Sequence, residues 1–498
     1  MVPMRTNVLR RCRFLGIVVF STALVFLLLL IPESASPPPG GAKKKPFVWN
    51  QDERWFALEE RFKELRSMGC EHIARIIDTG FNKGRRLLDA IDADALNPEA
   101  KVFDDIEETI FGLGPMIGAC PQRLSDYVQL VTRTREVVKG QSQRWDMDAH
   151  PVRDRMYRLI FGGRAALEEV MLQAPSSYLP SLVLAHDEPS KTPFTRILGV
   201  TIHSGDILVS RGGAPTSALI AQGNDYPGNF SHVALAYVDE KTSLASIIES
   251  SYESGVNVST LEDYLKDIKL RVMILRLRFD LPELVADPMV PHKAARLALE
   301  QAKGPHIPYD FEIDHHDHKT MYCSELVSAN YQECGVKLWM GISSISGPGV
   351  ISWLGAVGVR HFETQEPSDL EYDPQLCVVA EWRDPEALYL DHVDNAVTEE
   401  MLHDAEKGEK LSYAWYKLPV ARIVKLYSSL MDGVGSRGPI PEGMEAEAAL
   451  RIDNFIKEHT AIKERVLVLA QEFKHREGYT PTQWDLLKFA RVAKNELQ

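Results

Sequence analysis

The sequence predicts an α+β protein in which a β-rich middle region is flanked by two helical regions. Apolar residues recur at helical spacing up to about Leu182 and again beyond Pro385, whereas short β-rich runs separated by turn residues fill the segment between them. A length of 498 residues leaves room for about three domains with large buried cores. Apolar residues make up 45% and charged residues 25%, which excludes disordered, collagen-like and disulfide-scaffold proteins.

Charge and cysteine content narrow the classes of partner and site. The chain has 56 Lys and Arg against 70 Asp and Glu, and no Lys/Arg-rich block beyond the first 45 residues, so we expect no nucleic-acid partner. Six cysteines are scattered without a C-x-x-C pair, which argues against a zinc ribbon or a dithiol redox site. Cys70 and Cys120 could pair in an oxidising compartment. No cofactor is expected.

The first fifty residues predict export. Phe14–Ile31 is an 18-residue run without a charge, and as a helix it would span about 27 Å of the ~30 Å hydrocarbon layer. Arginines before this run place the rest of the chain outside the cytoplasm, although Lys43–Lys45 on the far side weaken the bias. We favour a membrane anchor, with a cleaved signal peptide ending near Ser34–Ser36 as the alternative.

The helical pattern between residues 51 and 182 predicts a bundle. Leu58, Phe62 and Leu65 keep a spacing of three to four residues with charges between them. Breaks are expected near Asn97–Pro98, Gly112–Pro115 and Gly162–Gly163.

The middle region predicts strands and two helices. The strands are expected at 206–210, 232–238, 245–250, 256–258, 272–279 and 377–382, and the helices at 292–303 and 321–334. Gly335 is placed as the glycine that ends the second helix. Beyond Pro385 an amphipathic face from Ile452 to Leu469 and a cap at Thr482 predict further helices.

Cys323 is the first chemical candidate, because the chain has no G-x-S-x-G, H-E-x-x-H, P-loop or G-x-G-x-x-G motif. It lies at the start of the second helix, for which Thr320 is the expected N-cap. The free N–H groups and dipole of a first helical turn favour a thiolate. The alternative is that Cys323 belongs to a buried stripe with Leu326 and Tyr331.

His232 and Glu249 are the candidates that would work with this thiol. Their separation of 249 − 232 = 17 lets an even-length hairpin loop place them directly opposite each other, with Cβ atoms about 4.5–5.5 Å apart. The carboxylate could then hold the imidazole toward a thiol, as the third member of a catalytic triad does. Each residue alone could equally be an ordinary polar strand end.

The segment Asp314–His318 resembles a metal site in composition only. Adjacent histidines on a loop rarely converge on one ion without further ligands and supporting hydrogen bonds. We therefore expect a solvated loop near the rim of the site and no metal.

Three short blocks and a closing segment between about Thr201 and Trp382 occur in a specific order and spacing. They are Gly205–Leu208 followed by Asn229–Val233, Ile248–Ser250 followed by Gly255–Val256, Pro308–Phe311 leading to Tyr322–Val327, and Pro374–Trp382. Together they resemble the YiiX/YebB-like permuted papain-fold amidases, relatives of the NlpC-type cell-wall peptidases.

This resemblance implies a circularly permuted papain-like core, an antiparallel sheet or barrel packed on helices, in which the His-bearing strands precede the Cys-bearing helix. It also implies roles: Cys323 as nucleophile, His232 as general base and acid, and Glu249 as orienting carboxylate. Tyr309 would bind substrate or polarise the carbonyl, and Asp206 would be structural. The chain departs from the family in a longer His-to-Glu loop and a His-rich insert.

The expected organisation is an anchor or signal with linker (1–45), a helical region (46–195), a permuted papain-like catalytic domain (196–384) and a C-terminal helical region (385–498). The expected function is that of a cysteine hydrolase of amide bonds acting outside the cytoplasm on a cell-wall peptide or a small amino-acyl amide. Two alternatives stay open: lipid acyl transfer or a thioesterase-like activity, and a non-catalytic ligand-binding scaffold.

Overall fold

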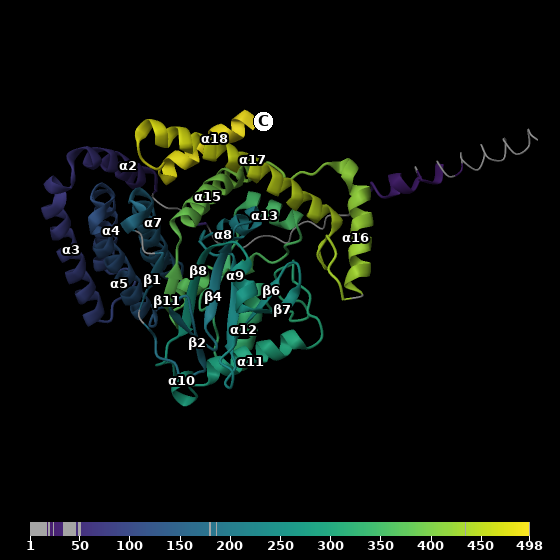
Figure 1. The fold of residues 1–498 in the computed structure, drawn as a ribbon, viewed down its shortest axis with the longest axis horizontal. Coiled ribbons are helices and arrows are strands. Elements are labelled where there is room, and N and C mark those ends of the chain that lie inside the picture. Colours follow the sequence, from purple (N-terminus) through teal and green to yellow (C-terminus); the bar gives the residue numbers. More distant parts are fainter. Residues whose placement is uncertain are drawn as a thin grey trace, which may run out of the picture.

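A seven-stranded antiparallel sheet forms the centre of the computed structural model, with helices around it (Figure 1). The structure describes residues 17, 20–22, 24–32, 46–47, 51–178, 181–185, 187–433 and 435–497. In spatial order the strands are β1 (Leu182–Leu184), β11 (Leu376–Trp382), β8 (Lys269–Leu277), β4 (Ile207–Gly212), β5 (His232–Val238), β6 (Ala245–Ser251) and β7 (Gly255–Thr260). The predicted α+β class is confirmed.

Two helices cover one face of this sheet, and a small hairpin covers the other. The helices are α11 (Val290–Lys303) and α12 (Cys323–Glu333), whose apolar side chains share a core with the sheet. The hairpin consists of β2 (Phe194–Ile197) and β3 (Val200–His203). Gly335 follows α12 with a positive φ, as a helix-ending glycine should.

Smaller elements complete the middle region. They are α8 (Pro215–Gln222), α9 (Leu261–Lys266), α10 (Pro282–Ala286), α13 (Pro348–Ala356), α14 (Asp369–Tyr372) and the two-residue strands β9 (Ser343–Ser344) and β10 (Glu363–Thr364).

The N-terminal region is the helical bundle that the apolar spacing predicts. It contains α2 (Gln51–Met68), α3 (Cys70–Ala93), α4 (Lys101–Ala119), α5 (Leu124–Ser142), α6 (His150–Met156), a π-helical segment (Tyr157–Gly162) and α7 (Gly163–Gln173), with 3₁₀ turns at Pro121–Arg123 and Ser176–Tyr178. The expected break at Asn97–Pro98 separates α3 from α4. The break expected at Gly112–Pro115 is wrong, because packing of the buried faces of α4 overrides the local preferences of Gly and Pro. At Gly162–Gly163 the π-helical segment ends and α7 begins, while the chain stays helical.

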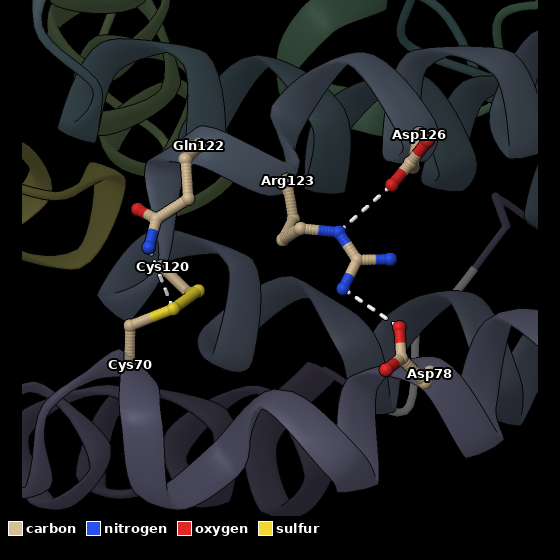
Figure 2. The surroundings of a disulfide bond; sticks show 6 residues. All are labelled: Cys70, Asp78, Cys120, Gln122, Arg123 and Asp126. Atoms are coloured by element: carbon tan, nitrogen blue, oxygen red, sulfur yellow. Dashed lines mark hydrogen bonds and ion pairs between the residues drawn. A yellow bond between two sulfur atoms is a disulfide. The ribbon is translucent and has the colours of Figure 1, made fainter.

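A disulfide joins the two ends of one helical hairpin in this bundle (Figure 2). Cys70 is the first residue of α3 and Cys120 follows α4, with their Cα atoms 4.9 Å apart. Beside it, Arg123 binds Asp78 of α3 at 2.7 Å and Asp126 of α5 at 2.8 Å. The bond and the ion pairs hold three helices of the bundle together.

The C-terminal region lies across the top of the molecule and along one side of it in Figure 1. Its elements are α15 (Pro385–Glu406), a 3₁₀ turn (Trp415–Lys417), α16 (Leu418–Asp432), α17 (Ala446–Glu477) and α18 (Gln483–Leu497). The predicted cap is confirmed: Thr482 Oγ1 donates to Asp485 at 2.8 Å and accepts from the Asp485 N–H at 3.4 Å.

Buried ion pairs join both helical regions to the sheet. Arg164 of α7 binds Glu381 of β11, and Arg271 of β8 binds Glu168 of α7 and Asp391 of α15. All five side chains are at most 3% exposed. Contacts therefore cross both of the expected domain boundaries, which stay predictions.

The apolar N-terminal run is only partly described. Residues 14–16, 18, 19 and 23 of the predicted anchor Phe14–Ile31 lie outside the described residues. Within the part of the chain that the structure describes, no helix has both the length and the apolar character to cross a bilayer. The anchor stays a prediction.

Loss of the disulfide should destabilise the bundle. Cys70→Ser is expected to lower the free energy of unfolding by about 2–4 kcal/mol, because the bond closes a loop over a sequence separation of 50 residues and so restricts the unfolded chain. Urea denaturation of the full chain, with and without reductant, measures the change. Cys334→Ser removes a free thiol and should leave both midpoints as in the wild type. If reductant shifts the urea midpoint of the wild type no more than that of Cys70→Ser, the disulfide between Cys70 and Cys120 is contradicted.

Candidate active site

Strands β5 and β6 bring His232 and Glu249 together. Glu249 lies directly opposite Ala234, so the expectation that it lies directly opposite His232 is wrong. Alternate residues of a strand share one face, and the actual register makes His232 and Glu249 diagonal neighbours on that face. The long glutamate side chain spans the diagonal, and His232 Nε2 lies 2.6 Å from Glu249 Oε2.

Helix α12 begins at Cys323 itself. Its N-cap is Tyr322, without a side-chain cap, so the expected cap at Thr320 is wrong: residues 320–322 are not yet helical. Ser250, next to Glu249 on β6, donates to the carbonyl of Met321 at 2.6 Å. This hydrogen bond fixes the start of the helix against the strand that carries the carboxylate.

The Cys323 thiol lies close enough to the His232 imidazole and to the backbone N–H of Val233 for both groups to lower its pKa. Burial would raise the pKa of Cys323, but the hydrogen bond and charge of His232 outweigh it and lower that pKa. Burial likewise opposes a charge on His232, yet hydrogen bonds with Cys323 and Glu249 raise the imidazole pKa to about 10. These shifts favour a thiolate–imidazolium pair at neutral pH.

Glu249 stays ionised beside this pair. Burial would raise its pKa, but the hydrogen bond and positive charge of His232 lower it. The structure thus brings the three predicted residues together: the imidazole is hydrogen-bonded to the carboxylate and interacts electrostatically with the thiol. Such an arrangement can deliver a nucleophilic sulfur, move a proton and keep the imidazole in one orientation.

The other described free thiols differ from Cys323. Cys334 at the end of α12 and Cys377 on β11 are each only partly buried. Burial raises the pKa of both, that of Cys377 to about 12. At neutral pH they are protonated thiols, so electrostatics single out Cys323 as the candidate nucleophile.

Tyr309 lies on the loop between α11 and α12, half-buried, with its ring edge-on to Phe311 at 5.0 Å. Burial and the nearby charge of Cys323 raise the pKa of Tyr309 well above its usual value. The neutral hydroxyl therefore keeps its proton near the thiol and can donate a hydrogen bond.

Glu366 is a residue near the thiol that the sequence analysis missed. It is 8% exposed, and burial together with the charges of Asp369 and Cys323 raises its pKa well above the usual value. Its backbone carbonyl accepts from Trp339 Nε1 at 2.9 Å, which anchors the segment. Glu366 lies in a loop outside every block of the resemblance, so no sequence signal pointed to it.

Asp206 lies buried at the start of β4. Its two carboxylate oxygens accept from Arg276 at 2.8 and 2.9 Å, and one of them also accepts from the backbone N–H of His203. The pairing ties β4 to β8, which suits the structural role that the resemblance implies.

The His-rich insert is held by hydrogen bonds within the protein. His318 Nδ1 lies 2.7 Å from Oε1 of Glu325, a carboxyl on α12 whose pKa is raised to about 9 by burial and by Asp310. The rings of His315 and His316 lie 4.1 Å apart. Among the described residues, no three His, Cys, Asp or Glu side chains are grouped so that they could hold a metal ion.

Comparison with known proteins gives one match. Residues 201–380 match the family model described as "Permuted papain-like amidase enzyme, YaeF/YiiX, C92 family". Neither the curated proteins nor the solved structures contain a match. The match spans the sheet from β4 to β11 and the helices α11 and α12, and it leaves both helical regions uncovered. Residues 201–380 are therefore similar to the permuted papain-like amidases of the YaeF/YiiX, C92 family, as the sequence blocks predicted.

Proposed function

We propose that this protein hydrolyses amide bonds with Cys323 as nucleophile, His232 as general acid and base, and Glu249 as the residue that orients the imidazole. The observation that carries the proposal is the placement of Cys323, at the start of α12, beside an imidazole that is hydrogen-bonded to Glu249 and lowers the thiol pKa. The family match supports the reaction class.

In the first half of the reaction, the Cys323 thiolate attacks the carbonyl carbon and a C–S bond forms. The imidazolium of His232 then gives its proton to the leaving nitrogen, so that the C–N bond breaks and an amine departs. In the second half, neutral His232 takes a proton from water, the hydroxide attacks the thioester, and the C–S bond breaks. A carboxylic acid leaves, and the thiolate–imidazolium pair is restored.

The negative charge that forms on the carbonyl oxygen needs hydrogen-bond donors in both halves of the reaction. The first-turn N–H groups of α12 point out of the end of the helix at which Cys323 stands. The neutral Tyr309 hydroxyl and the neutral Glu366 carboxyl are further donors near the thiol. Preorganised donors of this kind stabilise an oxyanion because they need no reorganisation as the charge forms.

We place the reaction outside the cytoplasm and expect a cell-wall peptide or a small amino-acyl amide as substrate. Two features of the chain support the location: the uncharged run Phe14–Ile31 and the disulfide between Cys70 and Cys120, a bond that persists mainly in oxidising compartments.

Alkylation should distinguish Cys323 from the other thiols. At neutral pH, iodoacetamide should modify Cys323 at least about tenfold faster than Cys377, since each pKa unit changes the thiolate fraction roughly tenfold. Cys323 is only 5% exposed, so exposure alone would predict the reverse order. Peptide mass spectrometry over a time course gives the rates. His232→Ala should slow Cys323 alone, and equal rates in the wild type would contradict an ionised Cys323.

Removal of the thiol tests the reaction itself. Cys323→Ala should reduce amide hydrolysis to the uncatalysed level, measured as amine release from cell-wall peptides and small amino-acyl amides, while Cys377→Ala retains activity. Incubation with phospholipid vesicles is run in parallel. An acyl chain found as a thioester on Cys323, with no amide cleaved, would replace hydrolysis by lipid acyl transfer. If the wild type yields neither a released amine nor an acyl thioester, the remaining interpretation is a non-catalytic binding scaffold.

Glu249 should set the alkaline limit of activity. The rate is expected to fall as pH rises through the His232 pKa of about 10, because the imidazolium is the acid that protonates the leaving nitrogen. Glu249→Gln removes a charge that favours imidazolium, so the His232 pKa falls and the alkaline limb moves to lower pH. The rate constant kcat should also drop by about 10²- to 10⁴-fold. Glu262→Gln, at an exposed carboxylate, serves as the matched control. If the alkaline limb of the pH–rate profile stays in place in Glu249→Gln, Glu249 does not stabilise the His232 imidazolium.

A further inference from the structure

Helix α16 carries an apolar stripe that the fold leaves in solvent. Its members are between 52% and 65% exposed: Val420, Ile423, Leu426, Tyr427 and Leu430. At 3.6 residues per turn they cover an arc of about 120° on one side of the helix. The opposite side, with Leu418, Ala421 and Ser428, is buried against the protein. The residues of the stripe therefore take no part in the packing that holds α16 against the protein.

The charges around the stripe are cationic. From Lys410 to Met431 the chain has no Asp or Glu, in a protein whose net charge is −14. Lys417 and Arg422 lie on the two flanks of the stripe, given the helical period. Trp415 and Tyr416, 66% and 58% exposed, stand at the end where α16 begins. An apolar stripe flanked by cations and aromatic residues is typical of a helix that lies in a membrane interface.

The apolar N-terminal run meets this same helix. Arg422 Nη1 donates to the backbone carbonyl of Leu29 at 3.0 Å, so the end of the run lies against the middle of α16. In Figure 1 the described part of the run leaves α16 at a steep angle and points away from the body of the protein. Exposed apolar side chains of its described part are Ile17, Phe20, Leu24, Val25, Phe26, Leu27, Leu28 and Ile31.

The inner side of α16 leads toward the candidate active site. Val424 packs with Ile440 and Met444 of the following loop, and Phe311 joins the same cluster. A Cβ placed on Gly443 would lie 3.4 Å from the Phe311 ring, in ordinary contact. Phe311 is the residue whose ring packs against Tyr309.

We propose that the exposed stripe of α16 is a membrane-docking surface whose occupant is a lipid bilayer with anionic headgroups. The helix lies in the plane of the interface, with its stripe among the acyl chains and Lys417 at the phosphates. The N-terminal run enters the bilayer beside it, in agreement with the steep angle between the two. The surface holds whether or not Cys323 is catalytic, since none of its residues belongs to the proposed triad.

Trp415 provides the probe for this contact. The full chain is reconstituted into vesicles of phosphatidylcholine and phosphatidylglycerol with brominated acyl chains, and its tryptophan fluorescence is measured. Subtracting the fluorescence of Trp415→Phe gives the contribution of Trp415. We expect the brominated lipid to quench Trp415. The combined variant Ile423→Glu, Leu426→Glu and Leu430→Glu should lose most of this quenching, several-fold relative to the wild type, because carboxylates expel the stripe from the acyl chains.

The controls separate docking from folding and from self-association. Val285→Glu changes an exposed apolar residue on α10, at the lower edge of Figure 1, and should quench as the wild type does. Circular dichroism and the Cys323 alkylation rate should be unchanged in the stripe variant, whose altered side chains are all exposed. Absence of Trp415 quenching in the wild type would overturn the proposal. So would a wild-type dimer, detected by cross-linking, that shields Trp415 from lipid and dissociates in the stripe variant.

Discussion

The buried carboxylate of Glu381 is the constraint on which the arrangement of the parts depends. An unpaired charge at this depth would cost several kcal/mol, so the strand β11 can be buried only where cations meet it. Arg164, Arg383 and Arg135 lower the Glu381 pKa to about 2 against the effect of burial, and Arg164 and Arg135 come from the N-terminal bundle. The bundle is therefore part of the support of the sheet. A core cut at residues 201–380 would end before Glu381 and would separate Arg271 from its partners Glu168 and Asp391.

The buried ion pairs and the pairing of neighbouring strands together position the candidate active site. Arg271 places β8 between the bundle and α15, β4 pairs with β8, and β5 pairs with β4. His232 is the first residue of β5 and therefore takes its position from backbone pairing. Cys323 takes its position from the start of a helix that is tied to β6. Because both candidate groups rest on rigid elements, no change of backbone conformation is needed to bring them together.

The sequence predicted what alternation and spacing can encode. The strand at 232–238 matches β5, and the odd separation of His232 and Glu249 correctly placed them on one face. The offset of two residues in their pairing was beyond prediction, because the hairpin loop that sets the register has no sequence signature here. Strand β1 was missed, since three residues are too few to show a period and its partner is β11, far along the chain. Glu366 was missed because its neutral state arises only from tertiary burial.

The stripe on α16 shows why a structure is needed even where a helix is predicted correctly. Between Leu418 and Met431 apolar residues occupy both sides of the helix, a pattern that sequence alone assigns to a buried helix. Only the packing shows that one side of the helix is buried against the protein and that the other side is exposed. The buried side, through Val424 and Ile440, reaches the ring of Phe311 beside Tyr309. One helix therefore presents the exposed stripe on one side and, on the other, packs against the loop that carries Phe311 and Tyr309.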